Sequence, residues 1–450
     1  MRIAMLSPVT WHTPRRCYGM CDSAVSLLTE GLIKRNVEVS LFSSEDTKAG
    51  ESQVAYYSQG HEEVAVTIPK EWECLRISQL FERGDAFDII HNHIGYLPLT
   101  YSGMTSTPVV TTIHDFLLPE NLPLYEYYNG RVYYVSVSDA HRIPELTYIS
   151  TIHYGIEMSQ FALRPEKGDY LLFLGDICHS KGAREAVEIS QKFGMKLIIA
   201  GIIEDEDYFK HFVAPHLDKE NVVYMGSIDP EKKSELMGKA YALVYPTNFN
   251  EPFCVSAVEA MACGTPVVAF HQGSMAEVIS HRQTGFLVSS VDEAVCVLTR
   301  VKELDRKKCR DWVEGKFSVD RMVEDYLRLY QKILTERKRE DHRPWGYYRV
   351  LAEETNHKVK KIVVYPGQRL SLQRHHRRAE HWYVIAGQAL VTRDNEEVFL
   401  VSGQAVDLPC GAWHRIMNPG NELMIFIEVQ TGDYFGEDDI ERVEDDYGRI

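Results

Sequence analysis

A group of polar side chains in the last quarter of the chain has the composition of a metal site. Gln373, His375 and Glu380 lie close together, and His414 follows further along. Two imidazoles, one carboxylate and one amide oxygen are nitrogen and oxygen ligands of the kind that Zn²⁺ accepts. The group therefore predicts a divalent metal site, with zinc as the expected ion.

Short strands must bring these ligands together. Gln373 and His375 are two positions apart, so in a strand they point to the same face, and Glu380 can return from the neighbouring stretch. The turns between short apolar strands are expected at Gly367, Gly387, Gly403 and Gly411. The expected unit is all-β.

The spacing of these residues resembles both halves of the cupin motif, with Gln373 in place of the usual first histidine. Cupins are β-barrels of the double-stranded β-helix type, with one metal in the lumen. Residues 341–449 further resemble the C-terminal isomerase domain of the type II mannose-6-phosphate isomerase and mannose-1-phosphate guanylyltransferase family. The matching blocks are residues 343–346, 366–373, 380–382 and 444–449.

This resemblance implies a reaction and a set of residues. The metal ligands that it implies are Gln373, His375, Glu380 and His414. The implied reaction is interconversion of mannose 6-phosphate and fructose 6-phosphate, in which a metal polarises the substrate and a base moves a proton between C1 and C2. Arg442 is the best candidate for a catalytic role, and Lys361 and Arg415 are weaker candidates for phosphate contacts.

Two other roles for the cupin stay open. It could serve only as a sugar-binding module, or as a dimerising module beside an active transferase. Cupins often pair through strand edges, so a homodimer is one expected state.

A second constellation surrounds a helix in the run 250–268. Pro252 is expected at the first helical position and Gly264 just past the helix end, with Glu251 preceding the helix. Free backbone N–H groups at such a helix start form an anion cradle. The residues expected to provide them are Phe253, Cys254 and Val255.

This run resembles the two-glutamate motif of retaining family 4 glycosyltransferases, which have the GT-B fold of two facing Rossmann-like domains. The resemblance covers about residues 1–335. It implies that Glu259 holds nucleotide ribose hydroxyls and that Glu251 lies by the donor sugar and its phosphate. The implied activity is hexosyl transfer with retention from a nucleotide sugar.

Three further positions match the family in order. Gly19 lies in the N-terminal glycine loop, and His114 ends a strand where it would line the reacting sugar. Lys181 would pair with the donor phosphate as a point charge. The departing phosphate would then be stabilised by Lys181 and by the helix start at Phe253 and Cys254.

The chain departs from the family pattern beside the phosphates. Asp176 stands where the family usually has arginine, and a carboxylate against a diphosphate would cost about 1–4 kcal/mol. Three interpretations stay open: His179 or Arg184 provides the missing charge, the donor is a simpler sugar phosphate, or Asp176 has disabled transfer. A glycoside phosphorylase, which exchanges inorganic phosphate with a glycoside, is the alternative function.

The elements that carry this second constellation alternate between strand and helix patterns, which predicts parallel sheets covered on both faces. The first helix would pack through Val25, Leu28 and Leu32. Strands are expected at residues 2–6, 37–42, 88–91, 109–114 and 132–137, and again at 170–175, 196–200, 222–225, 242–245 and 266–270.

The predicted fold class is therefore α/β plus all-β, a GT-B transferase followed by a cupin barrel. Its expected parts are an acceptor-side Rossmann-like domain at 1–160, a donor-side Rossmann-like domain at 161–335, a linker at 336–343 and the cupin at 344–450.

Composition narrows the partners. The formal charge of −16 argues against nucleic acid, and no apolar run approaches the roughly 18 residues of a membrane span. Nine scattered cysteines indicate free thiols in a reducing cytoplasm. The expected partners are a nucleotide sugar or sugar phosphate and a sugar or glycoside acceptor. Fusion to a mannose-phosphate isomerase-like domain makes mannose the expected sugar and GDP-mannose the expected donor.

Overall fold

The computed structural model describes residues 1–7, 20–42, 70–166, 168–337, 340–444 and 446. Its contacts divide the chain into two compact units, Met1–Leu329 (unit 1) and Tyr330–Ile450 (unit 2). Among the described residues, none of the helices has the length and apolar character needed to cross a membrane.

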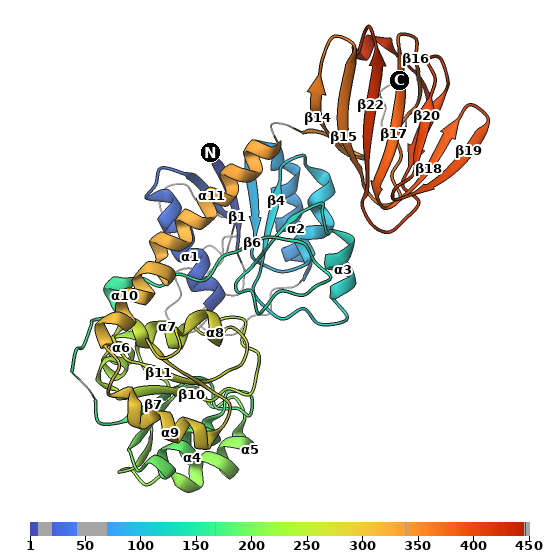
Figure 1. The fold of residues 1–450 in the computed structure, drawn as a ribbon. Helices are drawn as coiled ribbons and strands as arrows, with labels where there is room; N and C mark the ends of the chain where they lie inside the picture. The colour runs from blue at the N-terminus through green and yellow to red at the C-terminus, as the bar shows by residue number, and fades with distance from the viewer. Residues whose placement is uncertain (8–19, 43–69, 167, 338–339, 445, 447–450) are drawn as a thin grey trace. The chain divides into compact units, whose positions relative to one another are not determined.

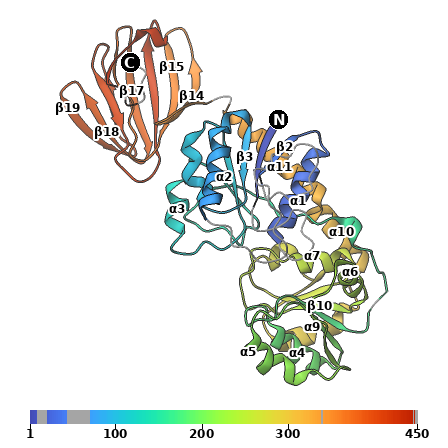
Figure 2. The same ribbon diagram turned by 180° about the vertical axis from the view of Figure 1, so that it is seen from behind.

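The first sheet of unit 1 has six parallel strands in the order β2-β1-β3-β4-β5-β6. They are β1 (Arg2–Leu6), β2 (Glu38–Phe42), β3 (Ile89–Asn92), β4 (Val109–Ile113), β5 (Tyr133–Ser136) and β6 (Tyr148–Thr151), with helices α1 (Met20–Ile33), α2 (Lys70–Glu82) and α3 (Leu122–Tyr127). Val25, Leu28 and Leu32 of α1 are buried, as the apolar stripe predicts. Helices cover both faces of this sheet (Figures 1 and 2).

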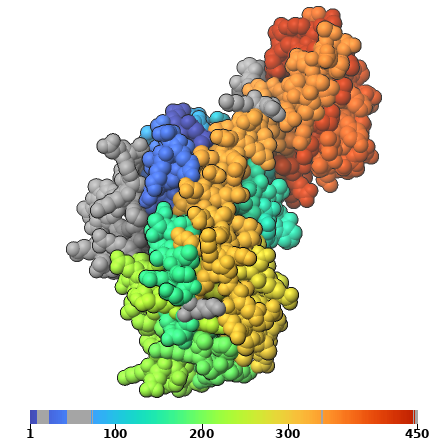
Figure 3. All heavy atoms as spheres, turned by 60° about the vertical axis from the view of Figure 1, so that its left-hand side comes forward, coloured from blue at the N-terminus to red at the C-terminus, as the bar shows by residue number. Residues whose placement is uncertain are grey.

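The second sheet of unit 1 also has six parallel strands, in the order β12-β11-β10-β7-β8-β9. They are β7 (Leu171–Leu174), β8 (Leu197–Ala200), β9 (Val222–Tyr224), β10 (Ala242–Tyr245), β11 (Val267–Phe270) and β12 (Gly285–Val288). The helices of this part are α4 (Ala183–Phe193), α5 (Glu206–Tyr208), α6 (Pro230–Lys239), α7 (Val255–Ala262), α8 (Met275–Val278), α9 (Val291–Val301) and α10 (Arg306–Phe317). Helix α11 (Val319–Arg337) begins in unit 1 and ends in unit 2. Figure 3 shows the orange atoms of α11 exposed along the surface.

The expected strands of both sheets are present, and two further strands were not predicted. These are β6 and β12, each the last strand at one edge of its sheet. An edge strand has a neighbour on one side only, so fewer of its residues need to be apolar. The residues of β6 are all only half-buried, and β12 begins with a glycine.

The predicted start of the helix in the run 250–268 is wrong. Helix α7 begins at Val255, and Cys254 is its N-cap with φ −96° and ψ 91°. Phe253 lies before the helix with its side chain fully buried, in a T-shaped contact with Tyr154 at 5.4 Å. The chain stays extended to insert this ring into the core, so Pro252 is not at the first helical position, and the N–H of Phe253 is not a helix-start donor.

Unit 2 consists of two antiparallel sheets, in the orders β13-β14-β15-β22-β17-β20 and β19-β18-β21-β16-β23. Its strands are β13 (Asp341–Arg343), β14 (Gly346–Glu353), β15 (His357–Val364), β16 (Leu372–His375), β17 (Arg378–Ala386), β18 (Gln388–Arg393), β19 (Glu396–Val401), β20 (Ala405–Leu408), β21 (His414–Met417), β22 (Met424–Gly432) and β23 (Ile440–Glu444). The core between the sheets includes Trp382 and Phe426. This is a cupin barrel.

Local backbone geometry agrees with two parts of the sequence interpretation and differs from a third. The four turn glycines of unit 2 have φ between 71° and 88°, a region that favours glycine. Gly264, just past α7, has φ 87°. The segment 336–343, which was expected to be a linker, contains regular structure instead. Helix α11 continues to Arg337, and Asp341–Arg343 forms β13, which pairs with β14.

Candidate functional site

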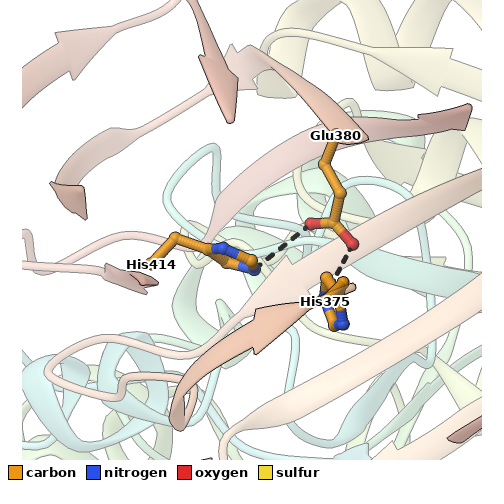
Figure 4. A group of neighbouring side chains, drawn as sticks. All are labelled: His375, Glu380 and His414. Carbon is orange, nitrogen blue, oxygen red and sulfur yellow. Dashed lines mark ion pairs between the residues drawn. The ribbon is translucent and has the colours of Figure 1, made fainter. Parts of the chain in front are cut away.

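Three of the four predicted metal ligands converge in unit 2. His375 ends β16, His414 begins β21, and Glu380 reaches them from β17 in the other sheet. Their ligand atoms all lie within 4.8 Å of one another. His375 Nε2 is 3.1 Å from Glu380 Oε1, and His414 Nε2 is 3.6 Å from Glu380 Oε2 (Figure 4).

The two histidines have buried nitrogens with no hydrogen-bond partner among the described residues. These atoms are Nδ1 and Nε2 of His375 and Nε2 of His414, in residues no more than 2% exposed. An unsatisfied buried polar group costs about 1–3 kcal/mol. His414 Nδ1 lies 2.9 Å from the Ala412 carbonyl, to which its N–H can donate, and this leaves Nε2 with a lone pair. The arrangement fits a bound cation.

The electrostatic surroundings of Glu380 and His414 favour the protonation states that bind metal. Burial alone would raise the pKa of Glu380, but His375, His414 and Arg378 hold that pKa below its usual value. Burial lowers the pKa of His414, although Glu380 opposes this. A carboxylate and a neutral imidazole are the forms that bind metal.

Gln373 and Arg442 lie beside this cluster. Gln373 pairs with His414 across β16 and β21 and with Arg442 across β16 and β23. The Gln373 side-chain oxygen accepts a hydrogen bond from Ser371 Oγ at 3.0 Å. Arg442 donates to Glu437 Oε2 at 3.1 Å, and Arg415 donates to Glu444 Oε2 at 2.6 Å. The amide of Gln373 therefore has a partner already, unlike the histidine nitrogens.

Sequence reasoning missed four other residues of the barrel interior. One of them, Lys360, lies with its Nζ 3.3 Å from Glu428 Oε1. Lys361, the predicted candidate for a phosphate contact, is the next residue along β15, so its side chain lies on the opposite face. The four missed residues are Lys360, Trp382, Glu428 and Gln430. Glu428 and Gln430 alternate along β22 with half-buried apolar residues, which was the available signal.

The candidate donor-phosphate residues of unit 1 form an ion pair. Lys181 Nζ contacts Glu251 Oε1, and Tyr245 donates to the same oxygen at 3.2 Å. Burial opposes the charge of Lys181, but the nearby Glu251 raises the Lys181 pKa. The Glu251 side chain is 5% exposed and that of Lys181 22%. A Cβ at Gly273 would lie 2.5 Å from the backbone of Glu251, which requires glycine there.

Asp176 contributes a further negative charge beside this pair. Burial raises its pKa, Lys181 opposes this, and Glu204 and Glu251 add to it. The two residues suggested as replacement cations lie against aromatic rings: His179 is 5.9 Å from Tyr208, and the Arg184 guanidinium is 5.2 Å from the centre of Phe212.

Glu259 also has a cationic partner in unit 1. Its Oε2 lies 2.5 Å from Lys233 Nζ, on α6. Burial raises the pKa of Glu259, and Lys233 opposes that shift. Lys233 was not predicted from the sequence, because the pair joins two separate helices, α6 and α7, through their tertiary packing.

His114 lies between two hydrogen-bonding partners. Its Nε2 is 2.9 Å from His93 Nδ1, and its Nδ1 is 2.6 Å from the Tyr154 hydroxyl. Burial, with a contribution from His141, lowers the pKa of His114 to about 3, so the ring is neutral at physiological pH. The remaining candidate, Gly19, lies outside the described residues.

Two protein-family models match parts of this chain. Residues 156–317 match the model of glycosyl transferases group 1, and residues 331–445 match the mannose-6-phosphate isomerase C-terminal model. The xanthan biosynthesis protein XanB of Xanthomonas campestris is 50% identical over 111 residues, which are 25% of this chain and 24% of XanB. Mannose-1-phosphate guanylyltransferase ManC of Salmonella typhimurium is 36% identical over 202 residues, 43% of this chain and 41% of ManC.

Solved structures support the fold of the larger part. Sucrose-phosphate synthase from Thermosynechococcus elongatus has a TM-score of 0.58 at 18% identity, covering 74% of this chain and 99% of its own. Anabaena HepE in complex with UDP has a TM-score of 0.58 at 17% identity, covering 74% and 100%.

The chain spans less than half the length of the curated relatives it matches. Family matches and fold agree on its architecture. It joins a group 1 glycosyl transferase domain, within a GT-B fold, to a mannose-6-phosphate isomerase C-terminal domain of cupin type.

Proposed function

We propose that unit 1 is a retaining family 4 glycosyltransferase that transfers a hexosyl group from a nucleotide sugar. The observation that carries the proposal is the Lys181–Glu251 pair, which lies within the segment that matches group 1 transferases. An ammonium held against a carboxylate can turn to a donor phosphate while the carboxylate stays by the sugar.

The other residues have complementary roles in this proposal. The departing phosphate would be stabilised by Lys181 and by the N–H groups at the start of α7, from Val255 onward. His114, neutral and fixed by two hydrogen bonds, would line the reacting sugar. Glu259 would bind the nucleotide ribose, with Lys233 balancing its charge.

The test of this activity is sugar transfer by the purified chain. Lys181→Ala and Glu251→Gln should each abolish transfer while the chain remains folded. Transfer that is unchanged in both variants would exclude the assignment. Formation of hexose 1-phosphate from a glycoside and inorganic phosphate would instead indicate the phosphorylase alternative, which the acidic Asp176 allows.

For unit 2 we propose metal-dependent interconversion of mannose 6-phosphate and fructose 6-phosphate. The buried His375–Glu380–His414 cluster, in which three imidazole nitrogens make no hydrogen bond among the described atoms, carries this proposal. These three residues would hold the ion, and Gln373 would join them if its amide leaves Ser371. A bound Zn²⁺ or other divalent ion supplies Lewis-acid polarisation of the substrate oxygens.

The chain's own groups would do the rest. Arg442, on the strand beside Gln373, would contact the substrate. The full chain, reconstituted with Zn²⁺, should convert mannose 6-phosphate. Sugar binding without turnover would instead favour a sugar-binding module, and a concentration-dependent dimer without either would favour a dimerising one.

We also propose mannose as the transferred sugar and GDP-mannose as the donor. ManC is named as a mannose-1-phosphate guanylyltransferase, and this chain carries a domain of the mannose-6-phosphate isomerase family. The free cysteines of the described residues suit a cytoplasmic setting. A thermal-shift screen of GDP-, UDP- and ADP-sugars tests the donor, since a ligand at one hundred times its Kd should add about 2.7 kcal/mol.

A further inference from the structure

We infer that Trp382 and Gln430 are positioning residues that hold the metal ligand Glu380 in its binding orientation, each by a donor shared with the second carboxylate Glu428. This inference rests on the metal site proposed for unit 2.

Each oxygen of Glu380 accepts a hydrogen bond from a different donor. Trp382 Nε1 donates to Glu380 Oε2 at 3.0 Å, and Gln430 Nε2 donates to Glu380 Oε1 at 2.9 Å. The histidines contact the same two oxygens at 3.1 and 3.6 Å, and the Trp382 ring also packs against His414 at 5.5 Å. Both rotation and retraction of the carboxylate would therefore break a buried hydrogen bond.

The same two donors also bind Glu428. Trp382 Nε1 donates to Glu428 Oε2 at 3.1 Å, and Gln430 Nε2 donates to Glu428 Oε1 at 2.9 Å. Each donor thus joins one oxygen of Glu380 to one oxygen of Glu428. All four residues are at most 4% exposed, so water does not compete for these bonds.

Strand register fixes this arrangement. Across β17 and β22, Glu380 is opposite Gln430 and Trp382 is opposite Glu428. On the far side of β22, Lys360 of β15 is opposite Glu428 and lies 3.3 Å from its Oε1. Lys360 thus places a positive charge beside Glu428, as Arg378 does beside Glu380 at 3.6 Å, and so keeps Glu428 in place as the anchor of both donors.

A purely structural network would have a different effect from a positioning one. If Trp382 and Gln430 only filled the barrel, their replacement would lower stability without altering the metal complex. If they orient Glu380, their replacement must weaken metal binding and change the coordination geometry, because outer-shell partners of metal ligands typically contribute about 10–100-fold in affinity.

The experiment uses the full chain, stripped of metal and titrated with Co²⁺, whose visible absorption reports both affinity and geometry. Gln430→Met keeps the side-chain length and Trp382→Phe keeps an aromatic ring, though a smaller one, and both changes remove the donor. Each should weaken Co²⁺ binding by about 10–100-fold and alter the spectrum.

Two matched variants serve as controls. Trp345→Phe removes another buried indole of unit 2, whose N–H has no partner among the described residues. Gln404→Met changes an exposed glutamine. Both should bind Co²⁺ as the unmodified chain does.

The outcomes separate this inference from the metal site itself. An unmodified chain that binds no Co²⁺ would refute the metal site. Binding by the unmodified chain, with the same affinity and spectrum in Gln430→Met and Trp382→Phe, would refute the positioning role alone. If Trp382→Phe fails to fold, Gln430→Met decides the question.

Discussion

The two candidate sites differ in how their polar groups are satisfied. In unit 1 the charged residues neutralise one another, as Lys181 does with Glu251 and Lys233 with Glu259. In unit 2 the Nε2 atoms of His375 and His414 face one carboxylate, that of Glu380, and make no hydrogen bond among the described atoms. The unit 2 site is thus preformed for a cation, whereas a ligand at unit 1 must exchange existing ion pairs for its own contacts.

The largest expected effect is the loss of metal affinity when a ligand of the preformed site in unit 2 is removed. His375→Ala or His414→Ala removes a direct ligand, so metal affinity should fall by more than about 100-fold, beyond the loss expected from an outer-shell partner. Competition with a chromogenic chelator measures it. His381→Ala, an exposed histidine of the same barrel, is the control. Undiminished affinity in both ligand variants would show that the ion binds elsewhere.

The paired site of unit 1 should respond differently to single and double changes. Lys181→Met leaves the 5% exposed Glu251 carboxylate without its cation, which should destabilise the chain by about 1–3 kcal/mol and reduce transfer by roughly 100-fold. The double variant Lys181→Met/Glu251→Gln should regain stability but not transfer. Urea unfolding and a transfer assay provide the two measurements. A double variant less stable than Lys181→Met would contradict the ion-pair account.

Low pH should lower the stability of unit 1, because several of its histidines are buried. Burial lowers the pKa values of His91, His93 and His114. Below the ordinary histidine pKa near 6.5, the unfolded chain takes up protons that the folded chain does not. Stability should therefore fall as the pH drops below about 6.5, with a slope near 1.4 kcal/mol per pH unit for each such histidine.

Urea unfolding at pH 7, 6 and 5 measures this slope. His91→Gln should reduce it, whereas His216→Gln, at an exposed site, should not. An identical slope in all three chains would mean that the histidines are not the cause.

The smallest expected effect concerns Asp176. Replacing it with asparagine removes a negative charge next to Lys181 and Glu251, which should strengthen binding of a nucleoside diphosphate by about 5-fold, close to 1 kcal/mol. Calorimetric titration with GDP measures this, with the exposed Asp207→Asn as the control. Weaker binding in Asp176→Asn would mean that this carboxylate contributes to ligand binding instead of opposing it.

The sequence predicted the elements that form the cores better than the contacts between them. Buried strands such as β7 and β10 read as continuous apolar runs, and the turn glycines of unit 2 marked its strand ends. The edge strand β6 was missed because it is only half-buried and half polar. The edge strand β12 was missed because its apolar run, Phe286 to Val288, is only three residues long and follows a glycine.

The site residues divide in the same way. His375, Glu380 and His414 were predicted because the family motif fixes their spacing. Lys233 and Lys360 were missed because the partner of a buried carboxylate is set by tertiary packing. The start of α7 was misplaced because burial of the Phe253 ring overrode the preference of proline for a first helical turn.

The metal site at His375 and His414 would also make the stability of unit 2 depend on the metal supply. Any ion that binds the folded barrel and not the unfolded chain stabilises it by mass action, by about 4.1 kcal/mol at one thousand times its Kd. Unit 1 has no comparable group of metal ligands among its described residues, so a metal ion does not stabilise it in this way. Under metal starvation the barrel should therefore be the first part of the chain to unfold and to be degraded, so that metal availability sets how much intact two-domain protein a cell retains.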